Sequence, residues 1–235
     1  MIKLPLAGTS KNITLSPSKI IAVGLNYRDH VNESLTFGND KLDIPNEPLI
    51  FTKTPNVLIG PEEPIIIPSH IKEYNFTDER VDPECELAVI IGEKCRHVPI
   101  EKAFEYVLGY TCFNDVSQRN IQKIDKSGWF RCKSFDTFGP IGTVIVTHND
   151  IGDPQKLQIS SSINGVIKQS SNTCNMIFSI PFLIYFISKQ FTLEEGDIIA
   201  TGTPAGISPI VPGDVVEVEI ERIGILKNPV MDEKI

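Results

Sequence analysis

Two glutamates two residues apart open the apolar segment ECELAVIIG, residues 84–92. Its β-branched composition and the flanking Pro83 and Gly92 predict a strand that is apolar on both faces and therefore buried. Side chains two apart on a strand share a face, about 6–7 Å from each other at a rise of roughly 3.3 Å per residue. Because ionised carboxylates on a buried face repel each other and lose hydration, Glu84 and Glu86 require a proton or a cation.

Asp115 is a third acid that fits this pair. In GYTCFNDVSQR a strand ends and a helix begins, so Asp115 lies at a strand end, where it can complete a cup of three oxygens. Carboxylate ligands without His or Cys favour Mg²⁺, Mn²⁺ or Ca²⁺ over zinc. Two alternatives stay open. Asp115 with Gln118 three residues later is typical of a helix N-cap, and a Glu-x-Glu pair at a strand start is typical of an exposed edge.

His30 and Glu33 have the spacing of one helical turn in YRDHVNE. On a helix they lie on one face, where the carboxylate can orient the imidazole and raise its basicity, as a general base for water activation requires. The alternative is an incidental pair on a solvated helix. The polar segment 32–46 that follows predicts a loop.

Lys133 and Thr203 are further candidates for a polar site. Apolar and aromatic neighbours surround Lys133 in FRCKSF, and a buried cation needs an anionic partner, although a lone lysine is also typical of a solvated surface. Thr203 lies in the turn TGTPAG, which can offer backbone N–H groups to an anion or be only a turn.

Strands predominate among the elements that must position these residues. The turn signal Asn164-Gly165 predicts a hairpin within 157–170, and three helices are expected at 100–107, 116–125 and 180–191. Without βαβ alternation, repeats or a low-complexity linker, the pattern predicts an α+β fold, predominantly β, in a single domain over residues 1–235. Further strands are predicted at 19–23, 48–53, 65–67, 84–92, 107–113, 141–147, 197–200 and 215–221.

The composition limits the classes of partner. The 235 residues carry a formal net charge of −8, and no cluster of Lys and Arg forms a stripe, which argues against nucleic acid or an anionic membrane as partner. A small molecule or a metal is the expected ligand. Because neither a signal peptide nor a membrane span is evident, we expect a cytoplasmic protein. The five cysteines lack a C-x-x-C pair and are expected to be reduced thiols.

Eight motifs in order resemble the fumarylacetoacetate hydrolase family, particularly its acylpyruvase and oxaloacetate decarboxylase branch. The resemblance runs from about residue 18 to residue 230. The motifs are GLNYRDHVNE, IFTKTPNVLIGPEEPI, ECELAVIIG, GYTCFNDVSQR, KSFDTFGPIG, ING, GDIIATGTPAGI and PGDVVEVEIERIGILKNPV.

This resemblance implies a mixed β-roll, usually a homodimer, in which Glu84, Glu86 and Asp115 bind Mg²⁺ or Mn²⁺, with Ca²⁺ as a substitute in crystals. It also implies that His30 and Glu33 form a base dyad on a segment that closes over the substrate. Lys133 is then expected beside the metal. The residues that the resemblance assigns to the substrate or its carboxylate are Arg119, Gln122 and Thr203.

The expected activity is cleavage of a C–C bond in a small 2,4-dioxo or 2-oxo acid, by acylpyruvate hydrolysis or oxaloacetate decarboxylation. A divalent cation with three protein ligands keeps positions for water and for two substrate oxygens. The alternative within enzymes is an isomerase or dehydratase of 2-oxo acids from aromatic or sugar-acid catabolism. A metal-binding or ligand-binding protein without turnover is a more distant alternative.

Overall fold

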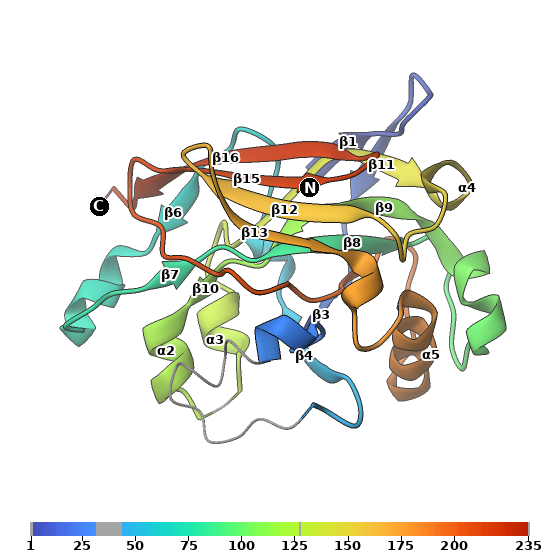
Figure 1. Cartoon of the computed structure of the whole chain (residues 1–235), viewed down its shortest axis with the longest axis horizontal. Coiled ribbons are helices and arrows are strands. Elements are labelled where there is room, and N and C mark those ends of the chain that lie inside the picture. The colour runs from blue at the N-terminus through green and yellow to red at the C-terminus, as the bar shows by residue number, and fades with distance from the viewer. Residues whose placement is uncertain (1, 32–43, 127, 235) are drawn as a thin grey trace.

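The computed structural model describes residues 2–31, 44–126 and 128–234 (Figure 1). The strands are β1 (Ile2–Pro5), β2 (Asn12–Leu15), β3 (Ile20–Gly24), β4 (Leu49–Lys53), β5 (Leu58–Ile59), β6 (Ile65–Ile67), β7 (Val81–Asp82), β8 (Cys85–Ile91), β9 (Val107–Asn114), β10 (Ser117–Gln118), β11 (Gly139–Thr147), β12 (Gln158–Ile163), β13 (Val166–Asn172), β14 (Ile198–Ala200), β15 (Val215–Ile220) and β16 (Gly224–Asp232). The α-helices are α2 (Arg119–Ile124), α3 (Phe130–Lys133), α4 (His148–Ile151) and α5 (Ile180–Gln190), and the 3₁₀ helices are η1 (Pro55–Val57), η2 (Ser69–Tyr74), η3 (Ile100–Tyr106) and η4 (Thr173–Asn175).

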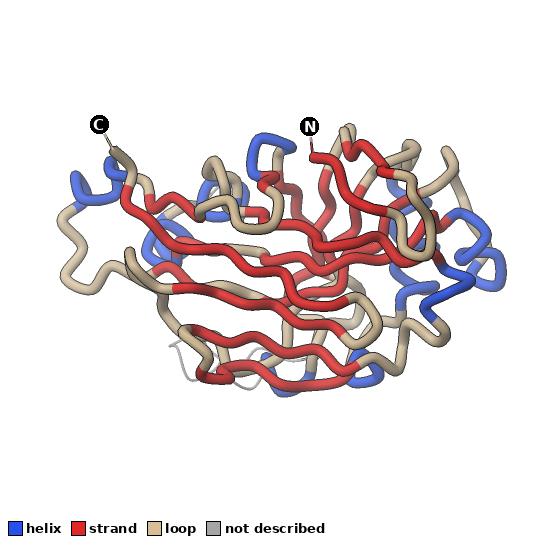
Figure 2. Tube along the Cα trace, turned by 90° about the horizontal axis from the view of Figure 1, so that it is seen from above, coloured by secondary structure: helices blue, strands red, loops and turns tan. Residues whose placement is uncertain are grey.

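Two large sheets make up most of the fold. One has seven strands in the order β4-β3-β14-β8-β9-β11-β5, and the other has five in the order β13-β12-β15-β16-β6. In the view of Figure 1 the helices α2, α3 and α5 lie below the sheets, and Figure 2 shows the long strands running beside one another across the molecule. This mixed, predominantly β architecture confirms the predicted fold class.

Strand β8 lies in the interior of the seven-stranded sheet, between β14 and β9. Cys85, Leu87 and the following odd-numbered residues face a core that includes α5 and the five-stranded sheet. The even-numbered residues Ala88 and Ile90 face a second core on the other side of the sheet. All seven residues of the strand are buried, as its apolar pattern predicts.

Several local predictions are confirmed. Asn164 and Gly165 both have positive φ, 52° and 78°, as a tight two-residue hairpin turn between β12 and β13 requires. The apolar segment after Ser179 forms α5, whose N-cap is the Ser179 side chain. All five cysteines are free thiols, four of them buried and Cys174 exposed.

Two other predicted helices are present but differ in detail. The helix predicted at 100–107 is a 3₁₀ helix over residues 100–106. The helix expected from residue 116 begins only at Arg119, because Ser117 and Gln118 pair with β7 instead. The N-terminal hairpin of β1 and β2 and the long strand β16 were not predicted. Among the described residues, no helix has the length and apolar character that crossing a membrane would require.

Candidate metal centre

The two glutamates and Asp115 meet at the start of β8. Cys85 is opposite Asn114 in the register of β8 and β9, so Glu84 and Asp115 face each other just beyond that pair, where the Asp115 N–H donates to the Glu84 carbonyl at 2.9 Å. One carboxylate oxygen from each of the three acids lies within 4.8 Å of the others. Because Glu84 and Glu86 are only 4% and 2% exposed on an interior strand, the exposed-edge alternative is wrong.

Asp115 does not cap the helix that follows it. The N-cap of α2 is Gln118, whose side-chain oxygen accepts a hydrogen bond from the Ile121 N–H at 2.9 Å. The short strand β10, which pairs with β7, lies between the end of β9 and this helix. The Asp115 carboxylate is therefore available to the acidic cluster, and its pattern with Gln118 in the sequence pointed to the wrong one of the two residues as the cap.

Two buried lysines and a partly buried arginine surround these carboxylates. Lys133, from α3, donates to Glu84 and, at 2.6 Å, to Asp115 Oδ2. Lys53, at the end of β4, donates to Asp115 Oδ1 at 2.6 Å, and Arg119 donates to Glu84. Lys133 is 3% exposed, so the alternative of a solvated lysine is wrong.

The two glutamates differ in their electrostatic surroundings. Burial would raise the pKa of Glu84, but Arg119 and Lys133 outweigh burial and hold its pKa far below the usual range. Burial raises the pKa of Glu86 well above its ordinary value, and the negative charges of Asp115 and Glu84 raise it further. For Lys133, burial has the opposite sign and would lower the pKa. The negative charges of Asp115 and Glu84 outweigh burial and raise the pKa of Lys133, so its ammonium form is stable.

Glu86 is bound by the turn that follows β14. The Gly202 N–H donates to Glu86 Oε2 at 2.9 Å, so the TGTPAG turn offers a backbone N–H to an anion, here a carboxylate of the protein itself. Gly202 has φ +97°, and a Cβ atom there would lie 2.7 Å from the Asn26 Cβ. A side chain at position 202 would therefore both strain the turn and push it away from Glu86.

The donor set fits a hard divalent cation. Three buried carboxylates supply oxygen ligands only, which Mg²⁺, Mn²⁺ and Ca²⁺ prefer. A cation bound there would also relieve the repulsion that raises the pKa of Glu86. Because a carboxylate oxygen has two lone pairs, Asp115 can bind a metal and keep its lysine partners. The buried triad can thus hold a divalent metal.

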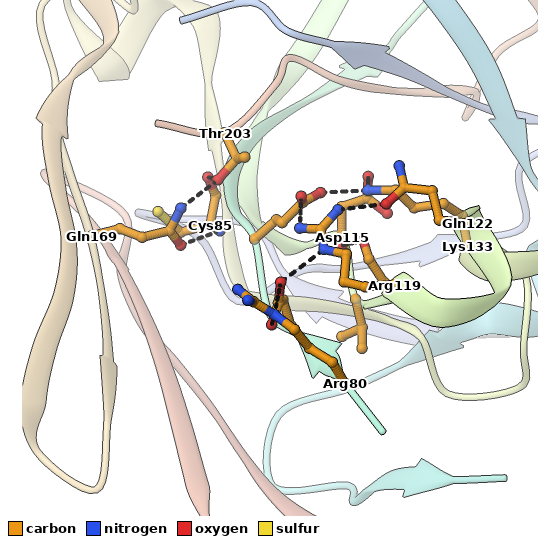
Figure 3. A network of polar contacts seen from close by, with 12 residues as sticks. Arg80, Cys85, Asp115, Arg119, Gln122, Lys133, Gln169 and Thr203 are labelled. Carbon is orange, nitrogen blue, oxygen red and sulfur yellow. Dashed lines mark hydrogen bonds and ion pairs between the residues drawn. The ribbon is translucent and has the colours of Figure 1, made fainter. Parts of the chain in front are cut away.

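The substrate candidates Arg119 and Gln122 lie beside this centre on α2 (Figure 3). Arg119 donates to Asp82 at 2.8 Å, to Gln122 Oε1 at 3.0 Å and to Glu84, so each guanidinium nitrogen has a partner within the protein. Thr203 lies on the other side of the cluster, and its hydroxyl donates to the Cys85 carbonyl at 2.9 Å. The hydroxyl proton of Thr203 is therefore engaged by the backbone.

His30 belongs to the same region. It is 6% exposed, in a helical segment that includes residues 28–31, and it lowers the pKa of Glu84 by a smaller amount than Arg119 and Lys133 do. Its predicted partner Glu33 lies outside the described residues, as does most of the predicted loop 32–46. The structure therefore places His30 near the acidic cluster and leaves the dyad as a prediction.

Two charged residues of the centre were not singled out from the sequence. Lys53 is fully buried, and burial lowers its pKa against the opposing effect of Asp115. Asp82, also fully buried, accepts hydrogen bonds from Arg119 and Arg80 and fixes the orientation of Arg119. The available signal was weak: Lys53 comes two residues after Phe51, on the same face of the strand predicted at 48–53.

The chain matches known proteins over nearly all of its length. The family model described as fumarylacetoacetate (FAA) hydrolase C-terminal matches residues 19–231. The mitochondrial oxaloacetate tautomerase Fahd2a of Rattus norvegicus is 40% identical over 240 residues, which cover 97% of this chain and 72% of the rat protein.

Two solved structures show the same fold at substantial sequence identity. The 5-carboxymethyl-2-hydroxymuconate delta-isomerase of Mycobacterium smegmatis has a TM-score of 0.81 at 37% identity, covering 97% of this chain and 87% of that one. The maleylpyruvate hydrolase of Sphingobium sp. SYK-6, in complex with manganese(II) and pyruvate, has a TM-score of 0.76 at 33% identity, covering 93% and 72% of the two chains.

Proposed function

Because the chain belongs to the fumarylacetoacetate hydrolase family, we propose that it is a metal-dependent enzyme that cleaves a C–C bond in a small 2,4-dioxo or 2-oxo acid. An acylpyruvate and oxaloacetate are the substrates that we favour. The observation that carries the proposal is the buried triad of Glu84, Glu86 and Asp115 with the ammonium group of Lys133 against it. A protein that only bound a ligand would not need so many buried charges, each of which is costly to desolvate.

Mg²⁺ or Mn²⁺ is the cofactor that we propose for the triad. The manganese and pyruvate in the Sphingobium maleylpyruvate hydrolase support a divalent metal and a 2-oxo acid in this fold. When bound, the cation would polarise the 2-oxo group at C2 and stabilise negative charge on its oxygen. This lowers the barrier to breaking the C3–C4 bond, because the electrons of that bond become the enolate of the 2-oxo group.

The residues around the triad have distinct proposed roles. Lys133 keeps its proton, because Asp115 and Glu84 raise its pKa, and therefore serves as a hydrogen-bond donor to a substrate oxygen. Arg119, Gln122 and the turn at Thr203 would bind the substrate or its carboxylate. His30, oriented by Glu33, would remove the proton from the attacking water in hydrolysis.

Isomerisation or tautomerisation of a 2-oxo acid is the second candidate function. The observation that favours it is the similarity to the rat oxaloacetate tautomerase and the mycobacterial isomerase, at 40% and 37% identity. Both reactions build the same negative charge on the 2-oxo oxygen. They need only a proton transfer at carbon, whereas hydrolysis also needs an activated water.

An activity panel with matched metal conditions separates these functions. The chelator-dialysed protein is assayed with acylpyruvates, oxaloacetate and hydroxymuconate-type acids, each with and without Mg²⁺ or Mn²⁺. We expect release of pyruvate from one of the first two substrates only when metal is present. If pyruvate is released no faster than with the same metal and no protein, while the enol absorbance is lost rapidly, then the activity is tautomerisation and not C–C cleavage. Full activity after chelation would contradict the role of the metal.

Two further predictions about the whole molecule remain proposals. We propose that residues 1–235 act as one catalytic domain and that the protein is a homodimer, as the family resemblance implies. Light scattering of the purified protein measures the second directly, and a mass near that of one 26.1 kDa chain would contradict it.

A further inference from the structure

Gln169, on β13, is buried at 1% exposure beside the metal centre, and all hydrogen-bonding positions of its side-chain amide are used (Figure 3). Its oxygen accepts from the Cys85 N–H at 3.0 Å and from the Ser161 hydroxyl at 2.8 Å. Its nitrogen donates to Thr203 Oγ1 at 2.8 Å and to the Pro204 carbonyl at 2.7 Å. An amide offers two donors and an acceptor with two lone pairs, so this one is saturated.

Cys85, the residue that Gln169 contacts, lies between the two glutamates of the triad. Strand β14 pairs with β8 only as far as Ala200 opposite Ala88, so the start of β8 has no strand neighbour on that side. Buried backbone groups must still be paired. Gln169 takes the Cys85 N–H, and Thr203 donates to the Cys85 carbonyl at 2.9 Å.

These contacts close a ring of three hydrogen bonds around the backbone of one residue, Cys85. Gln169 binds Cys85 directly and binds it again through Thr203, whose hydroxyl both accepts from the amide and donates to Cys85. Because the Glu84 and Glu86 side chains project from the residues on either side, the ring fixes the backbone that sets their separation.

The turn after β14 is pressed against β13, which keeps this ring compact. A Cβ atom at Gly206 would lie 2.1 Å from the Lys168 carbonyl oxygen, and Gly206 has φ +104°, so only glycine allows this approach. The pairing of β12 with β13 also shifts register between Ser161 and Ser162, next to the Gln169 position. A register shift of this kind re-aims a side chain, here into the gap beside β8.

We infer that Gln169 is a positioning residue of the metal centre, which holds the Glu84 and Glu86 carboxylates at the spacing of a divalent cation from the neighbouring sheet. It acts through Cys85 and Thr203 and does not touch the substrate. The inference rests on the proposed metal function. It also changes the role of the Thr203 hydroxyl from binding the substrate to supporting the metal ligands.

The test measures Mn²⁺ affinity without substrate, by electron paramagnetic resonance of free Mn²⁺ at a temperature where every variant is fully folded. We expect Gln169→Leu to weaken Mn²⁺ binding about 10–100-fold, the usual effect of losing a group that supports metal ligands. The control should keep the wild-type affinity: Val230→Ala truncates a buried side chain of β16 and so lowers stability alone.

A second pair of variants keeps the inference testable if Gln169→Leu fails to fold. Thr203→Val removes the hydroxyl and should weaken Mn²⁺ binding, whereas Thr203→Ser should restore it. If the ring acts as a unit, the double variant Gln169→Leu, Thr203→Val should bind little more weakly than either single variant. Wild-type affinity in the Gln169 and Thr203 variants would overturn the inference alone. Failure of the wild-type protein to bind Mn²⁺ would overturn it together with the proposed function.

Discussion

The two ends of strand β8 are equally buried but have different physical roles. At its start Glu84 and Glu86 are 4% and 2% exposed, and at its end Ile90 and Ile91 are fully buried. The isoleucines pack against other apolar side chains, which similar residues could replace. At the charged end, both carboxylate oxygens of Glu84 and of Asp115 have a cationic partner, and Glu86 Oε2 accepts from the Gly202 N–H. Burial alone therefore does not distinguish a core from a site, whereas the specificity of the contacts does.

Neutralising a carboxylate at the charged end should have the largest effect on activity. We expect Glu84→Gln, Glu86→Gln and Asp115→Asn each to abolish metal-dependent turnover while the protein stays folded, because removing one anion from a repelling set can relieve strain. Mg²⁺ should raise the melting temperature of the wild type and leave that of the variants unchanged.

The matched control lies on the same strand. Ile90→Ala should lower the free energy of unfolding by about 2–5 kcal/mol and keep metal-dependent turnover at temperatures where it is folded. Loss of turnover in folded Ile90→Ala, or retained turnover in the carboxylate variants, would break the distinction between the two ends.

His30 extends the charged end beyond the metal ligands. We expect His30→Ala to lower acylpyruvate hydrolysis roughly 10²–10⁴-fold, the usual contribution of a general base, and to lower oxaloacetate decarboxylation far less. Glu33→Gln should act in the same direction more weakly. Parallel losses of both activities in His30→Ala would show that this histidine serves substrate binding and not water activation.

Lys53 tests whether a buried cation that contacts the acidic cluster stabilises the protein more than a cation in an exposed ion pair. Lys53→Met removes one of two cationic partners of Asp115 and, with chelator present, should lower the free energy of unfolding in urea by about 3–5 kcal/mol. Added Mg²⁺ should recover part of that loss. The control is Lys72→Met at the exposed pair with Asp232, 3.6 Å apart, where less than about 1 kcal/mol is expected. Equal losses in both variants would refute the proposed difference.

The smallest expected effect comes from a polar pair remote from the charged end. Tyr110 Oη lies 2.9 Å from His148 Nδ1, and burial lowers the pKa of His148 from 6.5. A histidine whose pKa falls on folding contributes stability that is present above its unfolded pKa and is lost as pH falls through its folded pKa.

The wild type should therefore lose stability relative to His148→Gln as pH falls from 7 to 5, by a few degrees or less in melting temperature. Melting curves of the two proteins across this range measure the difference. A constant gap between the two proteins would show that His148 does not titrate differently on folding.

The sequence allowed prediction of features with local signals and missed those made by distant contacts. The Glu-x-Glu spacing, the apolar run of β8 and the Asn164-Gly165 turn each lie within a few residues, and each predicted a strand, a shared face or a hairpin. Lys53 and Gln169 reach the centre from strands far away in the sequence. The spacing of Lys53 from Phe51 was only a weak local signal, and nothing local marks a saturated amide. The Gln118 cap was missed because the short strand β10, paired with the distant β7, intervenes between Asp115 and the helix.

The contact between Gly202 and Glu86 joins residues 116 positions apart in the chain. The acidic end of β8 therefore cannot be completed until the segment after β14 is in place, and pairs with such large separations form slowly because a long loop must close first. During synthesis from the N-terminus, both glutamates emerge well before the turn that contains Gly202. They remain hydrated until the last third of the chain arrives. Assembly of the centre is thus a late event in folding, and chains truncated before residue 202 should lack it.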